Sequence, residues 1–164
     1  MKNNIGLRIS LVTQIILAIY FQMINWFSLG AWNDQPGFVP LLSPGKIEWG
    51  RIGSAGVFLL PVLLFSLAYW RRWRWLMWTG LIGYGAWLYF QIQTWWVPYL
   101  FGASRQWEDI YHRVFARSTK ILPSFGRHLA PDALHLTIQL LLLVIVVTLL
   151  IGLVRSRRDK RSSG

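Results

Sequence analysis

Glu108, His112 and His135 are the residues of this chain best suited by type and spacing to acid–base chemistry. Glu108 and His112 lie four residues apart, which places both on one face of a helix and lets a carboxylate orient an imidazole. A small membrane enzyme would use one of these two as its base and His135 as a second acid–base group. Such a pair more commonly lies on a solvated helix face. The sequence therefore leaves open whether the chain is an enzyme and favours a protein that is not one.

Metal and cofactor sites have no matching pattern. Residue types that bind divalent metals gather between positions 108 and 135, namely three histidines with Glu108, Asp109 and Asp132. Their spacing matches no motif such as His-Glu-x-x-His, so we expect no metal. There are no cysteines, which excludes disulfides and thiolate ligands. Aromatic residues between positions 87 and 101 could line a cofactor site, but an aromatic belt at a membrane interface explains them, and we expect no cofactor.

Uncharged polar residues inside apolar segments are the most informative candidates for binding. They cost free energy there unless they are paired, so they face other helices or a wet cavity. Those nearer one end of their segments are Gln22, Asn25, Gln91, Thr94, His135 and Gln139. If their faces converge, they form an outward-facing polar pocket for a ligand. The alternative is that they only hydrogen-bond between helices and hold the protein together, as polar and small residues commonly do. The small residues Thr79, Gly83 and Ala86 predict close helix packing.

A basic segment could bind anions. Between positions 98 and 131 the chain has five basic residues and two acidic ones. Arg113 and Arg117 lie one helical turn apart if this part is helical, and two guanidinium groups at that spacing suit a phosphate or carboxylate. An anionic lipid headgroup would account for these residues without catalysis.

The elements that must position these residues are transmembrane helices. The chain is 54% hydrophobic and only 14% charged, and its apolar residues form long runs. The runs predict spans at about 9–30, 52–70, 75–97 and 132–154, the third ending before Pro98. We expect the first to be an uncleaved helix, because it is too long for the apolar region of a signal peptide.

The segments between the spans predict the remaining structure. Prolines and glycines in 31–51 predict an irregular loop, and 98–131 forms the second long loop. Within it, residues 105–119 have apolar and polar sides, which predicts a short interfacial helix on the membrane surface. Residues 155–164 form a basic tail, disordered at its end.

Charge distribution predicts orientation. The N-terminus, the 71–74 turn and the tail have ten basic residues, against seven in the two loops. All ten lie close to the spans, so the positive-inside rule places both termini in the cytoplasm and both loops outside. The net charge of +11 therefore suits anionic lipids rather than nucleic acid.

The fold expected is all-α: an integral membrane four-helix transmembrane bundle with a short external interfacial helix, forming one membrane domain. The function expected is a non-enzymatic binding or accessory component of the plasma (inner) membrane, holding a lipid, a small amphiphile or a partner helix. Two alternatives remain: an enzyme acting on an anionic headgroup at the outer leaflet, and an oligomeric transporter or channel. A partner protein or a homo-oligomer is possible under each.

Overall fold

The computed structural model describes residues 4–27, 29–33 and 44–162, and this part of the chain is all-α, without a strand. Its elements in chain order are α1 (Ile5–Trp26), the 3-10 turn η1 (Gly30–Trp32), α2 (Pro44–Arg71), α3 (Arg74–Phe101), α4 (Arg105–Val114) and α5 (Ala133–Ser162). Two isolated β-bridges, Lys120 with Asp132 and Phe125 with His128, tie together the segment between α4 and α5.

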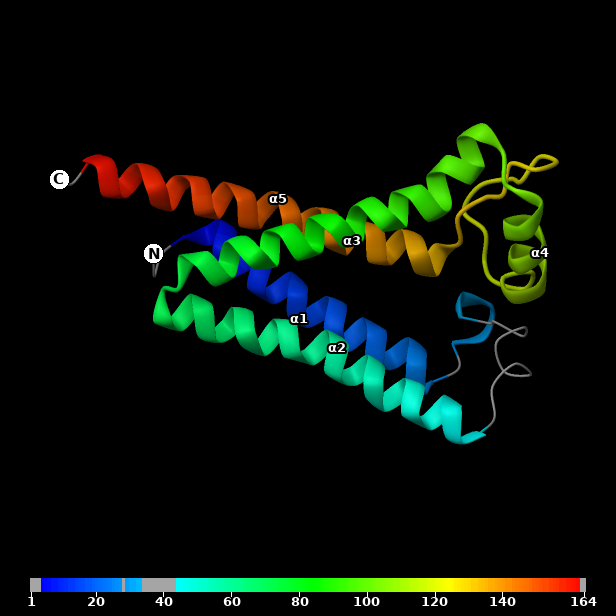
Figure 1. Cartoon of the computed structure of the whole chain (residues 1–164), viewed down its shortest axis with the longest axis horizontal. Coiled ribbons are helices and arrows are strands. Elements are labelled where there is room, and N and C mark those ends of the chain that lie inside the picture. Colours follow the sequence, from blue (N-terminus) through cyan, green and yellow to red (C-terminus); the bar gives the residue numbers. More distant parts are fainter. Residues whose placement is uncertain (1–3, 28, 34–43, 163–164) are drawn as a thin grey trace.

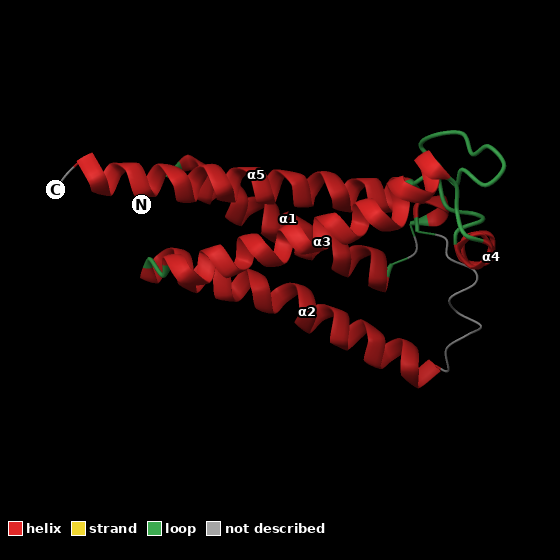
Figure 2. Cartoon of the chain, turned by 45° about the horizontal axis from the view of Figure 1, so that its top comes forward, coloured by secondary structure: helices red, strands yellow, loops and turns green. Residues whose placement is uncertain are grey.

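The four long helices lie side by side. α1 packs against α2 and α5, and α3 packs against the same two helices. Figure 1 shows the start of α1, the turn between α2 and α3 and the end of α5 at one end of the molecule, hereafter the terminal end. α4 lies at the opposite end, which we call the cap end, together with the loops on either side of it. Figure 2 shows α2 diverging from the other helices toward the cap end.

Two helices are long and apolar enough to cross a membrane. These are Ile5–Trp26 and the Ala133–Ser156 part of α5. α2 contains a shorter apolar stretch, Ala55–Arg71. Asn4 caps the start of α1: its side chain accepts a hydrogen bond from the backbone N–H of Leu7.

Several helix ends differ from the sequence prediction. The 31–51 segment is not an irregular loop throughout, because α2 begins at Pro44; residues 34–43 lie outside the described part of the chain. Proline suits the first turn of a helix, where no backbone N–H is needed. α3 does not stop before Pro98 but continues to Phe101, and its last turns bend in Figure 1, as expected where a proline breaks one helical hydrogen bond. α5 continues through much of the predicted tail to Ser162.

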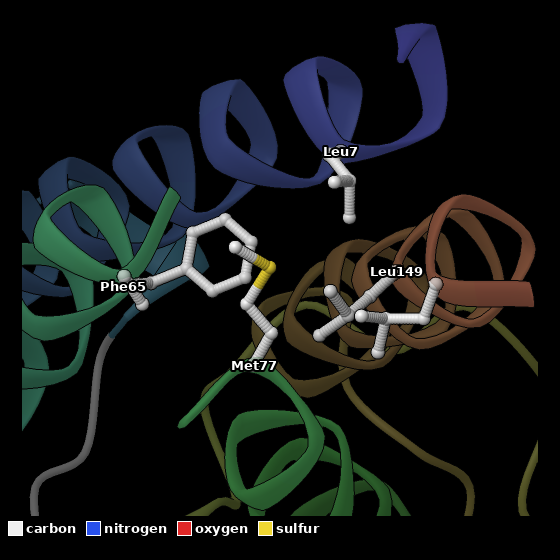
Figure 3. Packing of buried hydrophobic residues seen from close by; sticks show 6 residues of the cluster. Leu7, Phe65, Met77 and Leu149 are labelled. Atoms are coloured by element: carbon white, nitrogen blue, oxygen red, sulfur yellow. The ribbon is translucent and has the colours of Figure 1, made fainter. Parts of the chain in front are cut away.

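The buried side chains form three clusters along the molecule. Near the terminal end, α1, α2, α3 and α5 each contribute a large side chain, shown in Figure 3: Leu7, Phe65, Met77 and Leu149. The middle cluster surrounds Ile138 and Leu142 of α5. The third lies at the cap end around Trp95, which is 2% exposed. Each cluster joins helices that are distant in sequence, so these clusters fix the helix arrangement.

Close helix packing occurs at a different place from the one predicted. Gly83 of α3 is exposed and a Cβ atom added to it would meet nothing within 4 Å. Instead α1 and α5 cross at Gly6 and Gly152: a Cβ on Gly6 would lie 2.8 Å from the Thr148 carbonyl oxygen, and one on Gly152 would lie 2.7 Å from Leu7. Only glycine fits both positions at this separation.

Polar contacts hold the terminal end together. The Asn4 side chain donates hydrogen bonds to the Gly152 carbonyl (2.8 Å) and the Ser156 hydroxyl (3.0 Å), which joins α1 to α5. The Arg74 guanidinium donates to the carbonyls of Ser156 (3.0 Å) and Leu153 (3.1 Å), which joins α3 to α5. The first turns of α1 and α3 are therefore both fixed to α5.

Candidate functional site

A carboxylate and an imidazole are held together where α5 begins. Asp132, directly before the helix, is fully buried, and its Oδ1 accepts from the backbone N–H of His135 (2.8 Å) and from the ring Nδ1 of the same residue (2.7 Å). An ionised carboxylate only accepts hydrogen bonds, so the proton of the neutral ring lies on Nδ1. Nε2 is then an acceptor, and none of the described residues is hydrogen-bonded to it.

Aromatic rings enclose this imidazole. The His135 ring lies against Trp95, with centroids 4.1 Å apart and the two planes tilted by 32°, and the edge-on Phe115 ring is 5.5 Å away. Trp95 comes from α3 and Phe115 from the residue that ends α4, so three elements meet at the imidazole. The side chain of His135 keeps 16% of its surface exposed.

The segment after α4 closes over the carboxylate. The Ser118 hydroxyl donates to Asp132 Oδ2 (3.3 Å). The Lys120 ammonium donates to Ser118 Oγ (2.7 Å) and to the Phe115 carbonyl, and it lies over the Tyr111 ring at 4.7 Å. Burial lowers the pKa of Lys120, and the Asp132 carboxylate partly opposes that shift. Both carboxylate oxygens of Asp132 and the ammonium group of Lys120 thus already have hydrogen-bond partners within the protein.

Further contacts anchor this segment to the helices. The Tyr111 hydroxyl donates to the Ala130 carbonyl (2.7 Å). Burial raises the pKa of Tyr111; a hydrogen bond with Ser124 opposes this, and the Asp132 charge adds to it. The Thr119 backbone accepts from Ala133 N–H (2.8 Å) and donates to the Ala31 carbonyl (2.7 Å). Thr119 is therefore held by hydrogen bonds to two other segments of the chain and does not belong to a helix.

α4 differs from the predicted 105–119 helix for this reason. It ends at Val114, and its apolar side, with Tyr111 and Val114 buried, packs on Trp95 and Leu129 of the same protein. Arg113 and Arg117 are therefore not one turn apart on a common helix. Both are exposed, and Arg117 already has an interaction partner. The helical spacing assumed for the predicted anion grip is absent, and anion binding at Arg113 and Arg117 stays a prediction.

Three of the predicted ligand-binding glutamines have a buried amide atom without a partner. These atoms are Gln22 Nε2, Gln91 Oε1 and Gln139 Nε2. Trp96 Nε1 donates to Gln139 Oε1 (2.7 Å), and Trp26 Nε1 donates to Gln22 Oε1 (3.2 Å). An indole N–H can only donate, so both amides must turn their oxygen to the tryptophan. The free atoms of Gln22 and Gln139 are therefore N–H donors.

These glutamines lie at related depths. α1 and α3 run in the same direction, and the Tyr84 hydroxyl donates to Gln14 Oε1 (3.0 Å), which sets their register. Gln22 is eight residues beyond Gln14 and Gln91 is seven beyond Tyr84, about 12 and 10 Å at 1.5 Å per residue, so the two amides lie at one level. Gln139 lies nearer the cap end, beside Trp96, and His135 is one turn beyond it.

The other predicted site residues lie apart from this group. Thr94 is exposed, whereas Asn25 is half-buried and already has an interaction partner. Glu108 lies 3.8 Å from the Arg127 guanidinium, and His112 is exposed with its ring edge on Tyr111. Within the described residues, no group of three or more histidine or acidic side chains is placed to hold a metal ion.

Sequence reasoning missed the role of Asp132. The sequence pattern pairs Glu108 with His112 and gives His135 no carboxylate partner, whereas in the structure Asp132 is that partner. The signal was present: Asp-Ala-Leu-His after Pro131 puts a helix-capping carboxylate three residues before an imidazole.

Comparison of the chain with protein-family models, with curated proteins and with solved structures finds no match.

Proposed function

We propose that this chain is a multi-pass membrane protein in which α1, α2, α3 and α5 all cross the bilayer as a four-helix bundle. The outward surfaces of all four carry exposed large apolar side chains, for example Val12, Leu63, Ile82 and Leu143. Several buried side chains are polar instead, including Ser10, Gln14 and Gln139. A surface more apolar than parts of the interior is what lipid as solvent favours.

In the proposed orientation, the terminal end lies on the cytoplasmic side of the plasma membrane. Arg71, Arg72 and Arg155 are exposed at that end, close to the apolar parts of α2 and α5. Basic residues so placed favour the cytoplasmic side. The cap end, with Asp132 and His135, then faces outward.

The biochemical function proposed is binding: the protein holds the polar part of a lipid or other small amphiphile at the outer ends of α1, α3 and α5. The observation that carries this proposal is the set of unpartnered amide atoms on Gln22, Gln91 and Gln139. A buried polar atom without a hydrogen bond costs about 1–3 kcal/mol, and a bound group that supplies the missing partner, an acceptor for Gln22 and Gln139 and a donor for Gln91, removes that cost. Gln139 is 5% exposed, so bulk water reaches it little.

Two alternatives have less support. An enzyme that combines Glu108, His112 and His135 would need those groups within reach of one substrate atom, but Glu108 pairs with Arg127 and His112 points to the exposed side of α4. A transporter or channel would need an oligomer or a charged path. The amides could instead hydrogen-bond between helices and hold the protein together. In that case their replacement should destabilise the protein, which is the opposite of what the binding proposal predicts.

Replacement of Gln22 and Gln91 separates binding from packing. In lipid-free detergent, Gln22→Leu and Gln91→Leu should melt at the same temperature as the wild type or higher, because each removes an unpaired buried atom. Trp26, the indole partner of Gln22, is 48% exposed. With added membrane lipid, the melting temperature of the wild type should rise and that of both variants should rise less. Gln93→Leu, at an exposed glutamine of α3, is the matched control.

The binding proposal fails if both variants lose stability without lipid and respond to lipid as the wild type does. That result would assign the amides to helix packing. It would also fail if native mass spectrometry found the wild type without bound lipid or other small molecule after mild extraction.

A further inference from the structure

One face of α5 presents a hydrogen-bond acceptor and a hydrogen-bond donor whose directions the protein has already set. The acceptor is His135 Nε2, because Asp132 holds the proton on Nδ1 at 2.7 Å. The donor is Gln139 Nε2, because the Trp96 indole holds the amide oxygen at 2.7 Å. Neither arrangement depends on a ligand, so the pattern selects ligands rather than adapting to them.

The spacing of the two groups limits the ligand. Residues four apart on a helix lie on one face, with Cβ atoms about 6 Å apart. A matching ligand therefore has a hydroxyl or N–H group for His135 and an acceptor for Gln139 within a few bonds of each other. Its hydroxyl side faces the cap end and its acceptor side faces the membrane interior, toward the level of Gln91.

The charges around the pair exclude an anionic group at this position. Asp132 lies directly behind the imidazole and is fully buried. Two cations of the cap end are engaged elsewhere: Lys120 donates to Ser118 and to the Phe115 carbonyl, and Arg127 donates to the Ala103 carbonyl and faces Glu108. A phosphate would meet a carboxylate without a free cation to balance it.

We propose that the pair binds a neutral glycerolipid of the diacylglycerol type, in which a free hydroxyl lies next to an ester carbonyl. The hydroxyl donates to His135 Nε2, and the ester carbonyl accepts from Gln139 Nε2. This inference rests on the binding function proposed above and adds the class of ligand. The acyl chains then extend along the apolar surfaces of α3 and α5 into the bilayer.

Three lipids with identical acyl chains test the ligand class on the wild-type protein. Native mass spectrometry in detergent compares diacylglycerol, its 3-O-methyl ether and phosphatidic acid. The methyl ether keeps both esters but has no hydroxyl hydrogen for His135, and phosphatidic acid has a phosphate in place of the hydroxyl. Diacylglycerol should be retained about tenfold more than the ether, the size expected for one well-formed hydrogen bond in a desolvated site. Phosphatidic acid should be retained least.

Variants then test the residues. His135→Phe keeps a ring against Trp95 and should abolish the difference between diacylglycerol and its ether. His135→Gln should restore part of it, because its amide can donate to Asp132 and still offer an oxygen. Gln139→Leu should reduce the retention of both lipids about equally, since both have the ester carbonyl. If these changes impair folding, Trp96→Phe leaves both site residues in place and frees only the Gln139 amide, which should weaken lipid retention mildly.

The outcomes separate this inference from the function on which it rests. Equal retention of diacylglycerol and its ether, or preference for phosphatidic acid, overturns the neutral-lipid inference and leaves lipid binding intact. Retention of none of the three lipids also overturns it. If in addition Gln22→Leu and Gln91→Leu change no lipid response, the binding function itself is wrong.

Discussion

At the scale of single residues, tryptophan decides what two glutamines can do. A glutamine amide can normally rotate so that its oxygen and nitrogen swap positions. A neighbouring indole N–H, which can only donate, fixes the oxygen toward itself. Gln22 and Gln139 each lose it to a neighbouring tryptophan. Asp132 similarly removes the choice of tautomer from His135. Each of these three side chains could offer its donor and acceptor in two ways, and its neighbour leaves it only one.

Tyr111 gives a prediction about pH. Its hydroxyl donates to the Ala130 carbonyl at 2.7 Å, so Tyr111→Phe should lower the free energy of unfolding by about 1 kcal/mol at neutral pH. Because burial raises the pKa of Tyr111 above the unfolded value of 10.0, its stabilising effect is fully present below that pH and is lost as the pH rises through the folded-state pKa. The deficit of Tyr111→Phe should therefore shrink above pH 10.

Denaturant unfolding in detergent at pH 8 and above pH 10 measures this effect. Tyr89→Phe, at an exposed tyrosine of α3, should leave the unfolding free energy unchanged at both values. A Tyr111→Phe deficit that stayed constant across the range would mean that the hydroxyl does not titrate with unfolding.

The sequence shows which residue types could form a site, but it does not show which of these residues contact each other. Gln22, Gln91 and Gln139 stand out in the sequence as polar residues in apolar segments, and the structure buries one unpartnered amide atom of each, while their role in ligand binding stays a prediction. The pairing of Asp132 with His135 was missed although only three residues separate them. The closure by Ser118 and Lys120 depends on a chain reversal between α4 and α5, for which periodicity has no signal.

At the scale of elements, the α1–α5 crossing shows how little space two helices need when glycines face each other. Gly6 and Gly152 lie where the backbones approach most closely, and the nearby Asn4 side chain bonds to the Gly152 carbonyl. In lipid, packing of this kind replaces the hydrophobic effect between helices. The predicted stripe at Thr79, Gly83 and Ala86 has the same composition but faces outward.

Gly152→Ala should be destabilising at this crossing. The added Cβ would lie 2.7 Å from Leu7 Cδ2 and 3.0 Å from the Leu7 backbone nitrogen, so α1 must move. We expect a loss of about 1–3 kcal/mol in unfolding free energy, the usual cost of overpacking. Gly83→Ala is the matched control in α3: it has open space and gains helix propensity, so it should be neutral or slightly stabilising. Equal melting temperatures for the two variants would show that the crossing tolerates more separation.

Helix ends were the least predictable feature at this scale. Pro44 and Pro98 were both read as helix breakers, yet one begins a helix and the other lies inside one. α4 was predicted too long because its apolar pattern continues through Phe115, while the backbone of Thr119 bonds to Ala31 and Ala133. Tertiary hydrogen bonds of this kind override local pattern, and a single sequence contains no record of them.

At the scale of the whole molecule, the two ends differ in how their polar groups are satisfied. Hydrogen bonds from Asn4 and Arg74 hold the terminal end, and glycines bring its helices close. The cap end has the unpartnered amides, the Asp132–His135 pair and a divergence of α2. Under the proposed topology, a hydrogen-bonded terminal end and a cap end with unpartnered amides suit a protein that admits a ligand from one side.

The proposed topology makes a direct prediction, and a chain without cysteines is well suited to test it. Single cysteines at Ala116 in the cap, Arg71 at the α2–α3 turn and Arg155 near the end of α5 are all at exposed positions. With a membrane-impermeant thiol reagent, Ala116→Cys should label on intact cells, whereas Arg71→Cys and Arg155→Cys should label only after permeabilisation. Labelling of Arg71→Cys from outside would mean that α2 and α3 do not cross as proposed, and reversal at all three positions would place the lipid site in the cytoplasmic leaflet.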